Sequence, residues 1–339
     1  MSESAVIEFA GARERPATDL VGRLSAVALF DGLGEEGLDG CAQAFKRVEL
    51  APGEILCRQA CPHEGLYVLL DGEVKVCRRL PGQRELELAR LGAGEVIGEI
   101  PLLGGGTHSA SVRAVGRCSL LFLSREDFEA RTLAGTPCAL ELRRRIVGIA
   151  CARLRRNHDA IAAAIGGAPI GGAADTAVHP VQPLPTALPP RAYVSRLPLF
   201  RRLEPDVLTA LLDHGVALPV PRGHVIQREG MAPDVCYVTL NGAVEDVVRS
   251  DSTSVRVGFA GPGHAFGYLG LLDGEAASVA SVARERSLLL AIDGEYFTTL
   301  QRTRDPRLRA FAAGIEADLI GGLETAGRAL SHLAVASPA

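Results

Sequence analysis

The stretch VIGEIPLLGGGTHSASV, residues 96–112, decides how this chain is expected to fold. An apolar pair is followed by Gly98 and a short helix-forming segment, and then by a glycine-rich turn. A run of small residues then enters a strand. Glycine lets the backbone approach a ligand closely, and the start of a helix presents amides to an anion. The stretch therefore predicts half of a phosphate-binding site between two strands.

A diverged copy, AGPGHAFGYLGLLDG, begins at Ala260. Other landmarks repeat with it, including Leu-Phe near the start of each copy and a turn of the Asp-Gly or Asn-Gly type. The offset is 170 residues at Phe30/Phe200, Gly53/Gly223 and Gly72/Gly242, and 169 at Gly98/Gly267. Such a constant offset indicates an internal duplication.

Each copy is rich in short β-forming runs separated by turns, and Asp71-Gly72 and Asn241-Gly242 are typical of β-hairpins. We therefore expect a mainly β protein with flanking helices. It would contain two tandem jelly-roll-type barrels, each followed by a long helix. The predicted domains are an N-terminal tail (1–20), domain 1 (21–161), a Gly-, Ala- and Pro-rich linker (162–191) and domain 2 (192–333).

The two closing helices carry apolar stripes. Leu140, Val147, Leu154 and Ile161 recur every seven residues, and residues 308–333 follow a three-four spacing. Both patterns suit helix-on-helix packing. Three interpretations remain open: each helix packs on its own barrel, the helices form a dimer seam, or they pair within one chain.

The composition limits the function classes. The chain has 339 residues, 47% of them hydrophobic, and a formal net charge of −4, which argues against bulk nucleic-acid binding. It begins without an apolar leader and contains no run of about 20 apolar residues. We therefore expect a cytoplasmic protein with no membrane segment, whose eight cysteines are reduced thiols.

Several of these motifs together resemble the cyclic-nucleotide-binding domain of catabolite-activator-type regulators and protein-kinase regulatory subunits. They are DGEVKV, GEVIGEIPLL and SASV in the first copy, and GHVIQREG, NGAVEDV and GPGHAFGYLGLL in the second. The resemblance covers Leu29–Ile161 and Leu199–Leu333. It implies a site in which backbone amides hold a cyclic phosphate, a Glu accepts the ribose hydroxyl, and an Arg nine or ten residues later neutralises the phosphate.

In the first copy, this resemblance assigns ligand binding to Gly98, Glu99, Ile100, His108, Ser109 and Ala110. His108 stands where the family has arginine. Because a histidine is mostly neutral at pH 7, phosphate binding there is expected to be weaker and pH-dependent. Arg113, which shares a strand face with Ser111, is a candidate to compensate.

In the second copy, the resemblance gives a vestigial pocket formed by Gly267, Tyr268 and Ser278. Tyr268 replaces the Glu, and Ser278 stands at the Arg position. The acidic Asp273 and Glu275 would repel a phosphate. We therefore expect no cyclic nucleotide to bind here.

Other groups of residues have simpler structural explanations. Cys57, Cys61, His63 and Cys77 fit no strong metal template, so no metal site is predicted, although a redox or metal role stays open. The arginines of residues 143–156 are expected to form a solvated helix face.

No catalytic constellation is present, so we predict no enzyme activity. After the last helix the sequence has no room for a helix-turn-helix, so direct DNA binding is not expected.

Two functional hypotheses follow. In the first, domain 1 is a sensor of a cyclic nucleotide or another small anion, with no other cofactor, and the helix after it transmits the bound state. In the second, both pockets are vestigial and the protein is a scaffold that binds a protein partner or forms a homodimer through helices 140–161 and 308–333.

Overall fold

The computed structural model describes residues 17–79, 85–104, 107–108, 110–166, 188–250, 253–303 and 305–336. The chain divides into two compact units, Met1–Ile146 and Val147–Ala339, and the division falls inside helix α5 (Pro137–Ala164). Most of the predicted tail 1–20, most of the linker 162–191 and Ser109 lie outside the described residues.

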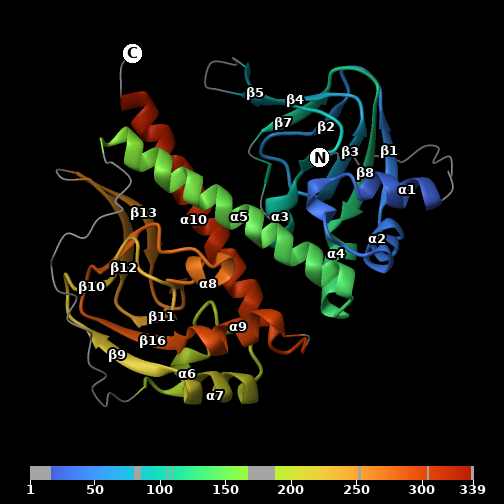
Figure 1. Ribbon diagram of the computed structural model, residues 1–339. Coiled ribbons are helices and arrows are strands. Elements are labelled where there is room, and N and C mark those ends of the chain that lie inside the picture. The colour runs from blue at the N-terminus through green and yellow to red at the C-terminus, as the bar shows by residue number, and fades with distance from the viewer. Residues whose placement is uncertain are drawn as a thin grey trace, which may run out of the picture. The chain divides into compact units, whose positions relative to one another are not determined.

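Unit 1 is built from two four-stranded antiparallel sheets, with strand orders β1-β8-β3-β6 and β2-β7-β4-β5 (Figure 1). Its strands are β1 (Lys46–Leu50), β2 (Ile55–Cys57), β3 (Gly65–Asp71), β4 (Val74–Arg79), β5 (Glu85–Leu91), β6 (Val96–Ile97), β7 (Ser111–Ala114) and β8 (Cys118–Ser124). Its helices are α1 (Ala17–Leu24), the short 3-10 helix η1 (Ala28–Phe30), α2 (Glu35–Ala42), α3 (Glu99–Gly104), α4 (Arg125–Leu133) and the start of α5.

Unit 2 repeats this plan with sheets β14-β11-β16-β9 and β10-β15-β12-β13. Its strands are β9 (Val216–Val220), β10 (Val225–Gln227), β11 (Val235–Asn241), β12 (Val244–Arg249), β13 (Ser254–Ala260), β14 (Ala265–Phe266), β15 (Ala280–Ala283) and β16 (Ser287–Asp293). Its helices, besides the second half of α5, are α6 (Arg191–Val194), α7 (Pro205–His214), α8 (Leu269–Asp273), α9 (Gly294–Arg302) and α10 (Arg309–Ala336).

The core of each unit lies between its two sheets. In unit 1, Leu69 and Leu120 from one sheet pack with Val74 and Val112 from the other, and all four are buried. In unit 2, Phe266 and Leu289 meet Val244 and Ala283 in the same way. The predicted mainly β, jelly-roll-type fold in two copies is confirmed. The sheets are open and stacked, however, and do not close into barrels.

The duplication is also visible in the backbone. The paired landmarks Gly72/Gly242 and Gly98/Gly267 all have positive φ, at 96° and 86° for the first pair and 85° and 75° for the second. The two predicted long helices are present, since α5 and α10 each contain 28 residues. Among the described residues, no helix combines the length and apolar character needed to cross a membrane.

The prediction that Asp71-Gly72 closes a β-hairpin is wrong. β3 pairs with β6 and β8, whereas β4 pairs with β5 and β7, so this turn carries the chain from one sheet to the other. A second crossing, between β7 and β8, packs against the first: Val115 N donates to Glu73 O (2.9 Å). A Cβ on Gly72 would lie 2.6 Å from Arg117 O, so only glycine permits this approach. Asn241-Gly242 makes the equivalent crossing in unit 2.

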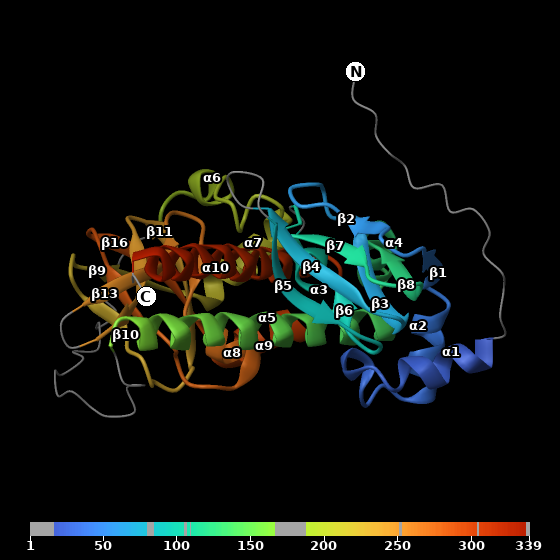
Figure 2. The same cartoon turned by 90° about the horizontal axis from the view of Figure 1, so that it is seen from above.

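The apolar stripe of α5 has a partner within the chain. Leu154 Cδ2 lies 3.5 Å from the position that a Cβ on Gly322 of α10 would occupy. Leu154 and Ile161 are both buried. The distal half of α5 and α10 run side by side in both views (Figures 1 and 2). Of the three interpretations, pairing of the two helices within one chain therefore describes this part of α5.

One pair of cysteines departs from the expected reduced state. Cys41 of α2 and Cys138 of α5 form a disulfide with a Cα–Cα distance of 6.1 Å, so the prediction that all eight thiols are reduced is wrong for this pair. Their sequence separation of 97 residues hid the pairing, which depends on α2 lying against the start of α5. The other six cysteines are free, and only Cys61 among them is exposed.

Cys138→Ser is expected to lower the free energy of unfolding by about 2–4 kcal/mol, because a disulfide that closes a long loop restricts the unfolded chain. Equilibrium denaturation of the wild-type protein with and without a thiol reductant should show a loss of similar size. Cys61→Ser, at the exposed free thiol, is the matched control and should leave the transition unchanged. A reductant that did not change the wild-type transition would contradict the disulfide.

Candidate functional site

The predicted anion site of unit 1 lies where β6 ends and α3 begins. Gly98 joins them with φ +85°. A Cβ at this position would lie 2.4 Å from His63 Nε2 and 2.7 Å from Gly65 O, so glycine is required by the close packing of the β2–β3 loop. We call the segment from Gly98 through α3 to Ala110 the first cassette. The β2–β3 loop covers its beginning.

The same loop also holds the end of the first cassette. His108 N donates to Cys61 O (2.9 Å), and Ala60 N donates to His108 O (2.8 Å). Pro62 and Thr107 form an isolated β-bridge beside them. These β-type backbone contacts hold His108 in place just before β7 begins.

His63 and His108 form a ring pair in this loop, with ring centroids 4.9 Å apart and an interplanar angle of 48°. His63 is 7% exposed, and neither of its ring nitrogens has a hydrogen-bond partner among the described residues. Burial, followed by the charges of His108 and Arg125, lowers the pKa of His63 to about 4. Burial also lowers the pKa of His108. Both rings are therefore neutral at pH 7, and position 108 carries no charge to offer a phosphate.

The other predicted residues of the first site occupy different environments. Glu99 is the first residue of α3 and is half-buried. Ile100 and Ala110 are buried, so they can contribute backbone but little side-chain surface. Arg113 lies on the β7 face opposite to Val112 and Ala114, which enter the core. Arg113 therefore points away from the core and shares the outer face of β7 with Ser111, as predicted.

The second cassette, from Gly267 through α8 to Ala280, has the same backbone turn with different side chains. Gly267 has φ +75°, as its counterpart does. Tyr268, which replaces the Glu, is buried at 7% exposure. Ser278, at the position of His108 in the repeat, is already engaged, because its Oγ is hydrogen-bonded to Nδ1 of His158 on α5 (2.9 Å).

Sequence reasoning missed three side chains that shape these sites. His63 was seen only as part of a cysteine group, Arg155 was placed on a solvated helix face, and His158 was given no role. The prediction of a solvated face is wrong for Arg155, whose side chain is 18% exposed and ion-paired with Asp273. No local pattern marks these residues, because each meets a partner at least 45 residues away in the chain.

The cysteine group shows no metal-binding geometry. Cys57 and Cys77 are buried, and burial raises the pKa of the Cys57 thiol to about 11. Across the part of the chain that the structure describes, no group of three or more His, Cys, Asp or Glu side chains is placed to hold a metal ion.

The comparisons with known proteins agree with this architecture. A family model described as the cyclic nucleotide-binding domain matches residues 47–132 and 217–304. The chain belongs to this family. Among curated relatives, the cyclic AMP receptor protein of Thermus thermophilus is 39% identical over 102 residues, which are 30% of this chain and 47% of the relative. A cyclic nucleotide-gated potassium channel of Mesorhizobium japonicum is 31% identical over 106 residues, 31% of this chain and 28% of the channel.

Two solved structures are also similar. The N-terminal domain of a transcriptional regulator from Streptomyces coelicolor A3(2) has 33% identity and a TM-score of 0.36, covering 42% of this chain and 94% of that one. The regulatory domain of Toxoplasma gondii PKA with cAMP has 20% identity and a TM-score of 0.33, covering 89% and 98%. The matches span only 28–60% of the length of the first curated relatives.

The low pKa of His63 predicts how stability depends on pH. Because the folded pKa of about 4 lies below the unfolded value near 6.5, the unfolded chain takes up the proton first. The contribution of His63 to the free energy of unfolding is therefore fully present above pH 6.5 and is lost as the pH falls towards 4, by up to about 3 kcal/mol.

Denaturation of the wild-type protein and His63→Gln at pH 7 and pH 4.5 measures this contribution. The free energy of unfolding should fall less in the variant than in the wild-type protein. The exposed His332→Gln is the control. Equal losses in His63→Gln and the wild-type protein would show that His63 is not buried as a neutral ring.

Proposed function

We propose that this chain is a non-enzymatic regulatory protein of the cytoplasm. In this proposal domain 1 (21–161) senses a cyclic nucleotide or a related small anion, and domain 2 (192–333) no longer does. The observation that carries the proposal is the difference between the two cassettes. The first keeps the left-handed Gly98 and has Glu99 at the start of α3. The second has a buried tyrosine in place of that carboxylate.

The state of His108 determines how domain 1 would bind its ligand. At neutral pH the ring is uncharged, so the cassette offers backbone amides and Glu99 but no cation. A cyclic phosphate keeps its negative charge at all relevant pH values. Bound beside His108, it would favour the imidazolium form and raise the pKa of that ring. Binding by domain 1 should therefore strengthen as the pH falls from 8 to 6.

The names of the relatives support a cyclic nucleotide as the ligand class. They include a cyclic AMP receptor protein and a cAMP-activated transcriptional regulator. Those proteins contain segments that this chain does not match, so we transfer the ligand class and no output activity.

The second candidate function is a scaffold with two vestigial pockets, and the neutral His63–His108 pair favours it. It requires a protein partner or a homodimer through helices 140–161 and 308–333. The apolar face at Leu154 and Ile161 is already covered within the chain. A scaffold would therefore have to bind its partner through other faces of these helices.

His108→Arg separates the two functions. Under the sensor proposal it should strengthen the binding of cyclic AMP by about 30-fold or more, because a permanent charge meets the phosphate. It should also remove the dependence of affinity on pH between 6 and 8. Calorimetric titration of wild-type and variant protein with cyclic AMP and cyclic GMP at both pH values measures this.

Ser278→Arg, at the equivalent position of the second cassette, is the matched control and should add no second binding event. The sensor proposal fails if neither wild-type nor His108→Arg protein releases heat up to millimolar nucleotide. The scaffold would then be the better account. Binding that appears only in His108→Arg would mean that the pocket is intact in shape but unused.

A further inference from the structure

The turn that follows α8 in the second cassette surrounds an arginine. Arg155 Nε donates to Asp273 Oδ2 (2.7 Å), and Nη2 donates to Oδ1 of the same carboxylate (2.8 Å). Nη1 donates to Ala276 O (2.6 Å), and Nη2 also reaches Glu275 O (3.3 Å). The guanidinium thus has four oxygen contacts, two of them a parallel bidentate pair.

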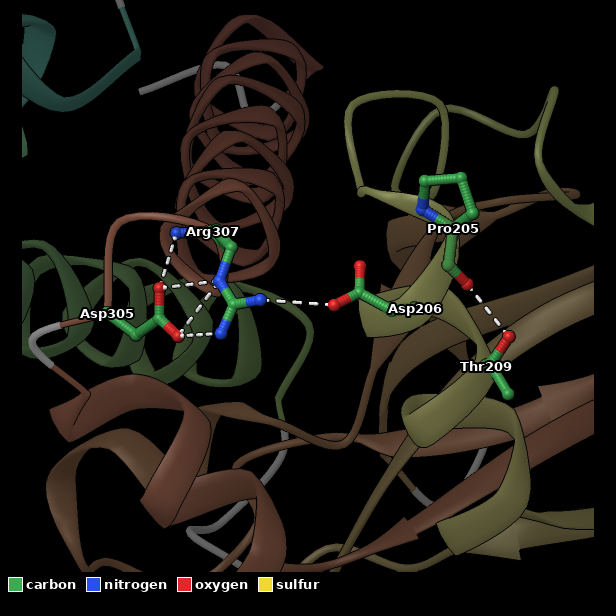
Figure 3. A network of polar contacts seen from close by, with 5 residues as sticks. All are labelled: Pro205, Asp206, Thr209, Asp305 and Arg307. Carbon is green, nitrogen blue, oxygen red and sulfur yellow. Dashed lines mark hydrogen bonds and ion pairs between the residues drawn. The ribbon is translucent and has the colours of Figure 1, made fainter.

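This contact is sheltered from water. The Arg155 and Asp273 side chains are only 18% and 14% exposed. The exposed ion pairs of unit 2 differ, since Arg307 and Asp206 are 50% and 64% exposed at 3.1 Å (Figure 3). Screening by water and salt therefore weakens the Arg155–Asp273 pair much less than a surface pair.

Two residues near Arg155 on α5 also have contacts within unit 2. His158, one turn beyond Arg155, is 5% exposed and is hydrogen-bonded to Ser278. Leu154 packs where α10 has Gly322, a residue without a side chain to obstruct it. Consecutive turns of α5 are thus fixed by the cassette on one side and by α10 on the other. All of these residues belong to unit 2, which begins at Val147.

The second cassette differs from the first in the charge of the groups that it presents. Asp273 and the carbonyls of residues 275 and 276 point their oxygens at one position, which suits a cation and excludes a phosphate. We infer that the second cassette is a guanidinium-binding site occupied by Arg155 of the chain's own helix α5. Its ligand is thus the distal part of α5, the helix that begins in unit 1.

This arrangement gives domain 2 a role that does not depend on any ligand in domain 1. α5 starts at Pro137 in unit 1 and ends at Ala164 in unit 2 as one continuous helix. Any movement that lifts its distal half from unit 2 must break the Arg155–Asp273 pair and the His158–Ser278 hydrogen bond. The second cassette therefore opposes movement of the distal half of α5, and its contacts add to the energy that such a movement requires.

Hydrogen exchange of the full-length chain, followed by mass spectrometry, tests the inference. Asp273→Asn keeps the shape of the side chain but removes its charge. It should raise the exchange rate of amides in residues 150–161 about 10- to 100-fold, because a charge-assisted contact holding that segment is lost. Arg155→Lys, which keeps the charge but cannot form the bidentate pair, should raise it less.

The double variant Arg155→Lys/Asp273→Asn should exchange no faster than the faster single variant, since both changes act on one contact. Asp206→Asn, which breaks the exposed pair of Figure 3, is the matched control and should leave residues 150–161 unchanged. The inference is overturned if Asp273→Asn leaves that segment at the wild-type rate, or if the two single effects add.

Exchange in β11 and β16 identifies any variant that unfolds the whole unit. If Asp273→Asn unfolds the whole unit, the test rests on Arg155→Lys alone. Exchange at the wild-type rate in residues 150–161 of Arg155→Lys would then overturn the inference. None of these measurements requires a nucleotide. Their outcome is therefore separate from that of the calorimetric test of domain 1.

Discussion

The fold of each unit depends on two chain crossings that touch where only glycine fits. Gly72 lies against the β7–β8 connection so closely that a Cβ would meet Arg117 O at 2.6 Å. Gly242 is packed in the same way, 2.8 Å from Arg286 O. These contacts fix where β7 and β15 end, and each of those strands leads directly out of a cassette. The position of a cassette therefore depends on a glycine in another part of the sequence.

On this common scaffold, the two cassettes differ in charge. The first has a neutral His108, packed against a second neutral ring, His63. The second has a carboxylate, Asp273, paired with the guanidinium of Arg155. A backbone turn presents both amides and carbonyls. Different side chains on the same turn can therefore leave it uncharged in one unit and make it suit a cation in the other, without altering its fold.

The sequence predicts the parts of this structure that local chemistry determines. The left-handed glycines at positions 72, 98, 242 and 267 mark the repeat, and the heptad spacing marks α5. Asp71-Gly72 shows the limit of this reasoning. The dipeptide correctly indicates a turn, but whether the flanking strands pair depends on β7 and β8, which are more than 30 residues away. His63 with His108, and Arg155 with Asp273, are likewise products of the tertiary fold.

The position of Arg155 explains why an arginine-rich helix face can mislead. Arg144, from the same run, makes an exposed ion pair within the helix, to Glu141 three residues away, as a solvated face should. Arg155 instead reaches a carboxylate 118 residues later. A buried guanidinium without its carboxylate would be strongly destabilising. Neither Arg155 nor Asp273 can therefore be replaced alone without a loss of stability. That constraint acts on the second cassette whether or not either domain binds a nucleotide. It is a reason for this cassette to keep the backbone turn that it shares with the first, including the left-handed Gly267.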